Sequence, residues 1–113
     1  MKYILALSLI LSSSVSFGAD RPKPIRKALI IFSAAWCGPC NQAKKDMNSN
    51  PQLTKLLEDY EVLKIDFDAD KEIVNSYNVS SVPTFVVVDK DRGEEIKRQK
   101  GYKTTAELVS FLK

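Results

Sequence analysis

The sequence predicts one α/β domain: a mixed sheet of about four strands, flanked by helices. Three observations support this: an apolar run at residues 28–32, a helical pattern soon after it, and later β-rich runs separated by short helical stretches. The 113-residue chain is short enough for a single domain, and its 44% hydrophobic and 27% charged content is ordinary for a globular protein. The predicted order of elements is β-α-β-α-β-β-α, without an internal repeat.

Residues 1–19 have the layout of a secretory signal peptide. Lys2 supplies a basic start, residues 3–11 are almost all apolar, and the residues after them are mostly small and polar. The apolar run is shorter than the roughly 20 residues that a membrane span needs. We expect cleavage after Gly18 or Ala19 and export to a bacterial-type periplasm, with secretion as the alternative. An uncleaved anchor is the other interpretation.

Residues 20–27 form a basic arm with four positive charges interleaved with two prolines. Its simplest interpretation is a solvated leader into the first strand, and contact with a membrane surface or a partner is the alternative. The formal net charge is +3. Removal of the signal peptide, which contains Lys2, would lower the net charge to about +2. This charge is too small to indicate nucleic-acid binding. The remaining chain, 28–113, is expected to be the folded domain.

The strand predicted at residues 28–33 is typical of a central parallel strand that is buried on both faces. A helix follows, with apolar residues at helical spacing as far as Met47. We expect this helix to break, because Asn50 and Pro51 resemble a cap followed by a proline in the first turn of a new helix. Apolar residues at helical spacing predict that this second helix covers residues 51–60.

Alternating residues at 62–67 predict the next strand, with Leu63, Ile65 and Phe67 on one face. Asp70 is a candidate cap for a short helix, and another β-rich run covers residues 85–88.

The stretch at 94–100 is mostly polar and suits an antiparallel edge strand, with Ile96 as its main apolar residue. Thr104 and Glu107 then have the spacing of a capping box at the start of a last helix.

The only two cysteines lie at the junction of the first strand and the first helix, in the stretch Ala35-Trp36-Cys37-Gly38-Pro39-Cys40. A helix N-terminus carries roughly half a positive charge, which stabilises a thiolate. Cysteines of Cys-x-x-Cys motifs in such places have pKa values of about 3.5–7.5. We expect Cys37 to be exposed at the mouth of the helix and Cys40 to be shielded one turn in. That asymmetry suits a thiol–disulfide exchanger.

Structural and metal-binding interpretations are weaker. A structural disulfide closing so short a loop would remove little chain entropy, and a zinc site needs four ligands in a chain without histidine or further cysteines. Asp66, Asp68 and Asp70 resemble part of a calcium loop. However, Lys71 stands where that loop needs glycine, and Tyr77 stands where it needs glutamate. We therefore expect no metal.

The pentapeptide 36–40, Trp-Cys-Gly-Pro-Cys, resembles the thioredoxin family, and the similarity extends over about 28–113. Val82-Pro83-Thr84 resembles the family's cis-proline loop, with Pro83 as the proline. The resemblance implies a minimal thioredoxin fold. It also implies that no cofactor is needed beyond a redox-active Cys37–Cys40 disulfide.

The resemblance also implies roles for the site residues. Cys37 corresponds to the nucleophile that forms a mixed disulfide with substrate, and Cys40 corresponds to the resolving thiol. Other residues would surround the pair or offer backbone groups to an extended substrate: Trp36, Gly38 and Pro39 in an exposed rim, and Val82 and Pro83 facing the cysteines.

The sequence departs from the family pattern in three places. The usual N-terminal strand and helix are not evident, and the helix after the motif is broken. Ile31 stands where the family has a buried aspartate, six residues before Cys37. Loss of that charge would leave Cys40 without an evident base, favour a Cys37 thiolate and make the protein more oxidising. Lys64 matches a family lysine that would tune these pKa values, or it simply occupies a polar face.

These observations predict an exported thiol–disulfide oxidoreductase that acts on protein thiols and disulfides, with reduction favoured over oxidation. A membrane-embedded thiol carrier would supply its electrons. We expect a monomer that does not bind nucleic acid. A redox-independent protein-docking module on the same fold is the alternative.

Overall fold

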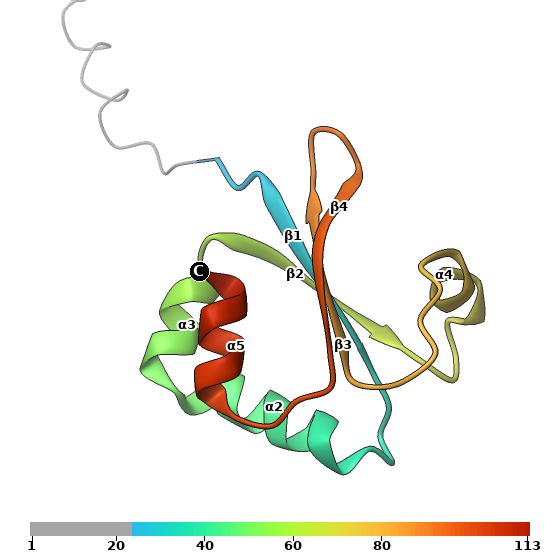
Figure 1. Ribbon diagram of the computed structural model, residues 1–113, viewed down its shortest axis with the longest axis horizontal. Coiled ribbons are helices and arrows are strands. Elements are labelled where there is room, and N and C mark those ends of the chain that lie inside the picture. Colours follow the sequence, from blue (N-terminus) through green and yellow to red (C-terminus); the bar gives the residue numbers. More distant parts are fainter. Residues whose placement is uncertain (1–23) are drawn as a thin grey trace, which may run out of the picture.

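The computed structural model describes residues 24–113 (Figure 1). The expectations for the signal peptide, most of the basic arm and any element before the first strand concern residues 1–23, outside this part. No helix within 24–113 is long and apolar enough to cross a membrane. In chain order the elements are β1 (Lys27–Ser33), α2 (Gly38–Ser49), α3 (Pro51–Leu57), β2 (Tyr60–Asp66), α4 (Lys71–Ser76), β3 (Thr84–Asp89), β4 (Glu94–Lys100) and α5 (Thr105–Leu112).

The four strands form one mixed sheet in the order β2-β1-β3-β4. β1 is central, parallel to β2 and antiparallel to β3. Helices α2, α3 and α5 cover one face of the sheet, and α4 lies on the other (Figure 1). The prediction of a four-stranded mixed sheet flanked by helices is confirmed, and the arrangement is a thioredoxin fold.

β1 is apolar from Ala28 to Phe32 because alternate residues of this stretch enter two different cores. Leu29 and Ile31 belong to the core beneath α2, α3 and α5. Ile30 and Phe32 belong to the core on the α4 side. A strand buried on both faces has no position for a polar side chain, and this explains the uninterrupted apolar run.

The predicted break after the first helix is confirmed, with Asn50 at the junction. The side-chain oxygen of Asn50 accepts hydrogen bonds from the N–H groups of Gln52 (2.9 Å) and Leu53 (3.1 Å) and so caps α3. Its own N–H donates to the Asp46 carbonyl oxygen at the end of α2 (2.8 Å). The second helix is shorter than predicted, because it ends at Leu57 and the chain enters β2 at residue 60.

Of two other predicted caps, the one at Asp70 does not form, and the capping box at Thr104 forms only in part. Asp70 occupies the N-cap position of α4 but makes no capping bond, because its Oδ2 accepts from the Asp66 N–H instead (3.0 Å). Thr104 caps α5 by accepting from the Glu107 N–H (3.2 Å). This is the one half of the predicted capping box that forms in the part of the chain described.

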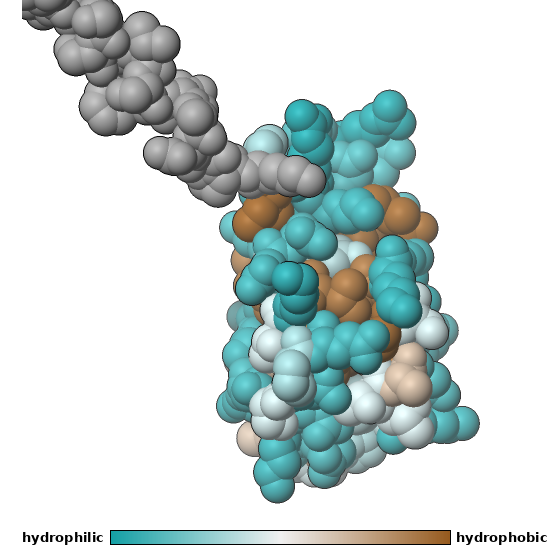
Figure 2. Space-filling model, turned by 90° about the vertical axis from the view of Figure 1, so that its left-hand side faces the viewer, coloured by the Kyte–Doolittle hydropathy of each residue, from teal (hydrophilic) through white to brown (hydrophobic). Residues whose placement is uncertain are grey.

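The two edges of the sheet differ. β4 is an antiparallel edge strand, as predicted, and is dominated by charged and polar side chains. Its pairing with β3 shifts register at Val87 and Val88, and Ile96 is exposed. β2 forms the opposite edge and pairs in regular register with β1. Figure 2 shows the side of the molecule that carries α3 and α5, where apolar side chains gather between hydrophilic ones.

Candidate active site

The cysteine motif occupies the turn between β1 and α2, as its position in the sequence predicts. The Cys37 N–H donates to the Ala34 carbonyl oxygen (3.1 Å), which closes this turn, and Cys37 is the N-cap of α2. Pro39 lies in the first helical turn, where the missing N–H of proline costs nothing. The local sequence therefore places both cysteines in the first turn of a helix.

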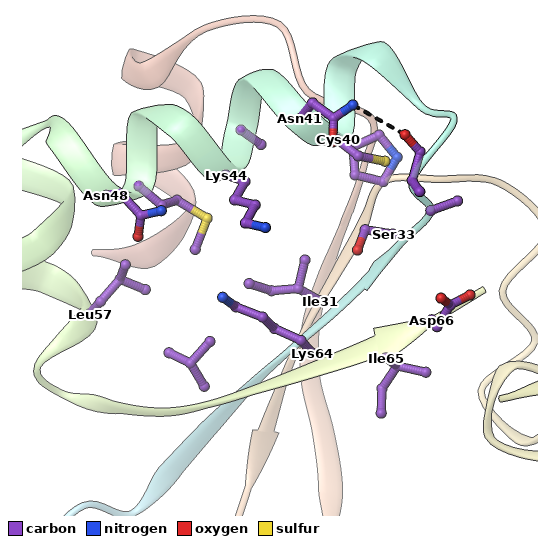
Figure 3. Close-up of a pocket in the computed structure, with 16 residues that line it drawn as sticks. Ile31, Ser33, Cys40, Asn41, Lys44, Asn48, Leu57, Lys64, Ile65 and Asp66 are labelled. Atoms are coloured by element: carbon purple, nitrogen blue, oxygen red, sulfur yellow. Dashed lines mark hydrogen bonds between the residues drawn. The ribbon is translucent and has the colours of Figure 1, made fainter. Parts of the chain in front are cut away.

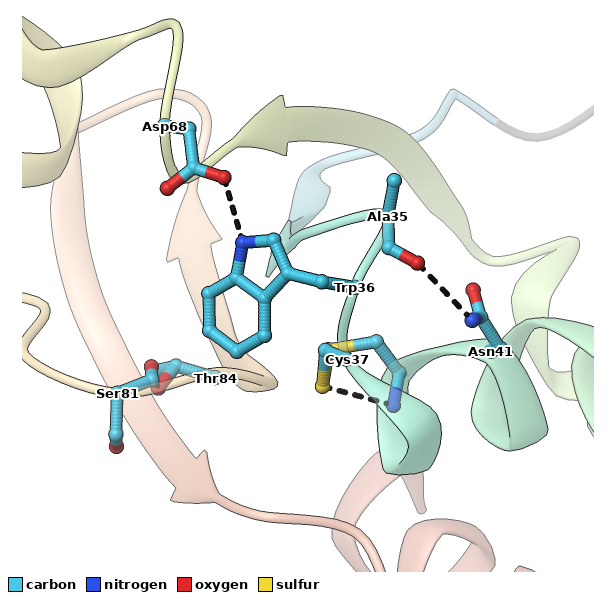
Figure 4. The surroundings of a disulfide bond; sticks show 8 residues. Ala35, Trp36, Cys37, Asn41, Asp68, Ser81 and Thr84 are labelled. Carbon is cyan, nitrogen blue, oxygen red and sulfur yellow. Dashed lines mark hydrogen bonds between the residues drawn. A yellow bond between two sulfur atoms is a disulfide. The ribbon is translucent and has the colours of Figure 1, made fainter.

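Cys37 and Cys40 are joined in a disulfide, with their Cα atoms 5.2 Å apart. Within the pair, the Cys37 sulfur accepts a hydrogen bond from the Cys40 backbone N–H (3.2 Å; Figure 4). The first turn of α2 contains no acidic residue. A backbone donor and the positive end of the helix thus face the Cys37 sulfur, and both stabilise negative charge there after reduction.

The predicted difference in exposure between the two cysteines is wrong for this disulfide-bonded state. Cys37 is 4% exposed and Cys40 is 5% exposed. Both pack in a small apolar cluster with Ala34, against which Phe67 and Val82 lie. Because the Cys37 sulfur turns inward to cap the helix and to bond Cys40, its place at the mouth of the helix does not expose it.

The predicted rim residues Trp36, Gly38 and Pro39 are all exposed, and Trp36 is 67% exposed. The Trp36 indole N–H donates to Asp68 Oδ2 at 2.7 Å, which fixes the ring beside the disulfide (Figure 4). The sequence interpretation placed Asp68 at the end of a predicted strand and in a rejected calcium loop, and it did not predict this contact. The position of Asp68 at that strand end was the one available signal.

Val82 and Pro83 lie beside the cysteines, and the peptide bond between them is cis, as the family resemblance implied. The Pro83 carbonyl oxygen already accepts a hydrogen bond from the Gly101 N–H (2.7 Å). The backbone N–H and C=O of Val82 make no hydrogen bond within residues 24–113. Of the two residues expected to offer backbone groups to a substrate, Val82 is therefore the one with both groups free.

A cavity of about 530 Å³ lies next to the disulfide, and both Cys40 and Pro83 contribute to its wall (Figure 3). Ile31 and Lys64 also line it, and they are direct partners in the pairing of β1 with β2. The register therefore places Lys64 on the helix-covered face, in the wall that Cys40 shares. A role for Lys64 in tuning the cysteines stays a prediction. Residues 24–113 contain no cluster of side chains suited to a metal ion.

Comparison with known proteins gives consistent matches. The thioredoxin family model matches residues 10–113. Thioredoxin H2 of Arabidopsis thaliana is 35% identical over 82 residues, covering 72% of this chain and 58% of that relative. A thioredoxin-like protein of Synechocystis is 32% identical over 94 residues, covering 83% of both chains. The solution structure of a thioredoxin from Thermus thermophilus has a TM-score of 0.68 and 29% identity, covering 77% of this chain and 71% of that one.

The fold and the disulfide-forming pair at the start of α2 define the class of this protein, a thiol–disulfide oxidoreductase. The chain belongs to the thioredoxin family.

Proposed function

We propose that this chain is an exported thioredoxin-like protein that exchanges disulfides with protein substrates through its Cys-Gly-Pro-Cys pair. The observation that carries the proposal is the Cys37 sulfur at the N-terminus of α2, where it accepts the Cys40 N–H. This environment stabilises the thiolate, which is the nucleophilic form of the residue.

In the reducing direction, the Cys37 thiolate attacks one sulfur of a substrate disulfide. A mixed disulfide forms, and the other substrate sulfur leaves as a thiolate. The Cys40 thiol then loses its proton and attacks the Cys37 sulfur, which releases the second substrate thiolate and restores the Cys37–Cys40 disulfide. Two electrons pass from the protein dithiol to the substrate disulfide, and the reverse sequence oxidises a substrate dithiol.

Substrate recognition involves the surface around the disulfide. The exposed Trp36 is held by Asp68 on one side of the pair. The free backbone groups of Val82 lie in the segment next to the cysteines. An extended substrate segment at Val82 would gain backbone hydrogen bonds, which are independent of side-chain sequence and so suit a protein with many substrates.

We favour reduction as the direction of exchange. The chain has the complete Trp-Cys-Gly-Pro-Cys motif, on which its resemblance to thioredoxins rests, and thioredoxins are reductants. Ile31 works against strong reducing power, because the core position beside the pair carries no negative charge. The signal-like leader at 1–19 supports export to the periplasm. In that compartment electrons would come from a membrane-embedded thiol carrier.

Reduction of insulin disulfides by the purified protein, with dithiothreitol as electron source, tests the exchange chemistry. Cys37→Ser should abolish turnover and form no mixed disulfide. The matched variant Cys40→Ser should also lose turnover, but when it is reduced beforehand and mixed with insulin in the absence of dithiothreitol it should accumulate a mixed disulfide with substrate at Cys37, because the resolving thiol is absent. Insulin reduction by Cys37→Ser at the wild-type rate would refute the assignment.

A further inference from the structure

The cavity beside the disulfide has features that disulfide exchange does not use. It lies between α2 on one side and β1 and β2 on the other, and most of its wall is apolar. Ile31, Met47, Leu57 and Val62 contribute large side chains to this wall. Its volume of about 530 Å³ falls within the roughly 300–1,000 Å³ of small-molecule sites.

Two lysines from different elements meet in this cavity. Lys44 extends from α2 and Lys64 from β2, and their amine ends point into the same space between helix and strand (Figure 3). Within residues 24–113, neither amine forms an ion pair or a hydrogen bond. Two ammonium groups beside an apolar wall favour a ligand that has both a negative group and an apolar stem.

The one carboxylate in the wall does not neutralise these lysines. Asp66 lies near Ser33, away from the amine ends of the two lysines (Figure 3). Its Oδ1 accepts hydrogen bonds from the backbone N–H groups of Asp68 (2.8 Å) and Ala69 (3.1 Å). The Asp66 charge is therefore engaged in the turn that follows β2.

We propose that this cavity binds a small amphipathic carboxylate. The carboxylate group lies between Lys44 and Lys64, and an aliphatic stem extends along Ile31, Met47 and Leu57. A free small molecule is the occupant that fits, because the volume accommodates a whole ligand under α2. The site requires no thiol chemistry and goes beyond the proposed exchange activity.

Titration of the oxidised chain with decanoate tests this site, followed by backbone amide shifts in NMR spectra and by calorimetry. Decanol has the same stem without the charge, and acetate has the charge without the stem. We expect saturable decanoate binding with shifts at cavity residues, at least tenfold weaker binding of decanol, and none of acetate. Lys44→Gln and Lys64→Gln should each weaken decanoate binding about tenfold.

Lys45→Gln is the matched control, because Lys45 is the next residue on α2, is exposed and does not line the cavity. It should bind decanoate as the wild type does. Equal binding of decanol and decanoate, unchanged affinity in both cavity variants, or shifts confined to residues outside the cavity would each overturn the proposal. Tighter binding of an acetylated hexapeptide with a central glutamate would assign the cavity to a peptide and overturn it as well.

Discussion

Substitution of Ile31 by aspartate would place a carboxyl group in the wall that Cys40 shares. Ile31 is 8% exposed and lies in the core beneath α2. A carboxylate there repels the negative charge of a thiolate on the reduced cysteine pair. This repulsion destabilises the reduced protein relative to the disulfide form. Ile31→Asp should therefore make the protein a stronger reductant. Ile31→Asn is the matched control, because it changes size and polarity in the same way without adding charge.

The dimensions of the cavity set the expected magnitude. Ile31 and Cys40 line the same cavity of about 530 Å³, which is about 10 Å across and so limits the separation of a carboxylate and a thiolate in its wall to about this distance; at about 10 Å and an effective dielectric constant of about 20 the repulsion is about 1.7 kcal/mol. For a two-electron couple this corresponds to a reduction potential about 35 mV more negative. Because burial raises the pKa of a carboxyl group, the difference between the two variants should be small where the aspartate is protonated and should grow as the pH rises.

Equilibration of each variant with glutathione redox buffers between pH 6 and pH 9 gives these potentials. Both variants replace a buried isoleucine by a polar residue and should lose about 3 kcal/mol of stability, so circular dichroism must first show that each is folded. Identical potentials for folded Ile31→Asp and Ile31→Asn across the whole pH range would refute the reasoning. The wild-type potential places the protein either near the roughly −270 mV of thioredoxin-like reductants or at about −120 to −180 mV, among oxidants and isomerases.

Three further variants test the stability of the fold and the rim. Asn50→Ala removes the cap of α3 and should cost about 1 kcal/mol, or about 4–8 °C in thermal melting, whereas exposed Asn48→Ala should change stability by less than about 0.5 kcal/mol. Equal melting temperatures would contradict the capping role. Asp68→Ala removes the hydrogen bond that holds the indole beside the disulfide. It should lower kcat/KM for insulin reduction about threefold without changing the reduction potential. An unchanged kcat/KM would count against a role for the Trp36–Asp68 contact in substrate binding. Burial, and then the hydrogen bond to a carboxylate (2.6 Å), raise the pKa of Tyr102 above its ordinary 10.0, so the hydroxyl stabilises the fold below pH 10 and loses this effect at higher pH. Tyr102→Phe should be about 1 kcal/mol less stable than wild type at pH 7 in urea unfolding, with a gap that narrows above pH 10, and a gap independent of pH would contradict this linkage.

Local patterns predicted most of the fold. The apolar run of β1 indicates a strand that is buried on both faces. The alternation at residues 62–67 indicates a strand whose two faces lie in different surroundings. Asn50 followed by Pro51 marks a helix boundary from sequence alone, because both the cap and the proline act within one turn. Asp70 failed as a cap for a related reason. The Asp70 side chain accepts from the Asp66 N–H, which is nearly as close in sequence as the first N–H groups of α4, and so it does not cap the helix.

The site was predicted at the level of residues but not of their surroundings. The spacing of Cys37 and Cys40 indicates a reactive pair. Their equal burial could not be predicted, because it depends on Phe67 and Val82, which are distant in sequence and pack against the pair in the folded protein. The contact between Trp36 and Asp68 joins residues 32 positions apart. The cavity beside Cys40 likewise exists only because β2 pairs with β1 in one particular register beneath α2, and no sequence period encodes that space.

The unequal edges of the sheet limit how molecules of this protein can associate. Along β4, charged side chains and the register shift at Val87 and Val88 discourage another strand from pairing. Within residues 24–113, β2 is therefore the edge that a further strand would join more readily, because it pairs with β1 in regular register. Two copies that paired along β2 would occupy this edge in both molecules, so this mode of association favours a closed dimer over a growing fibre.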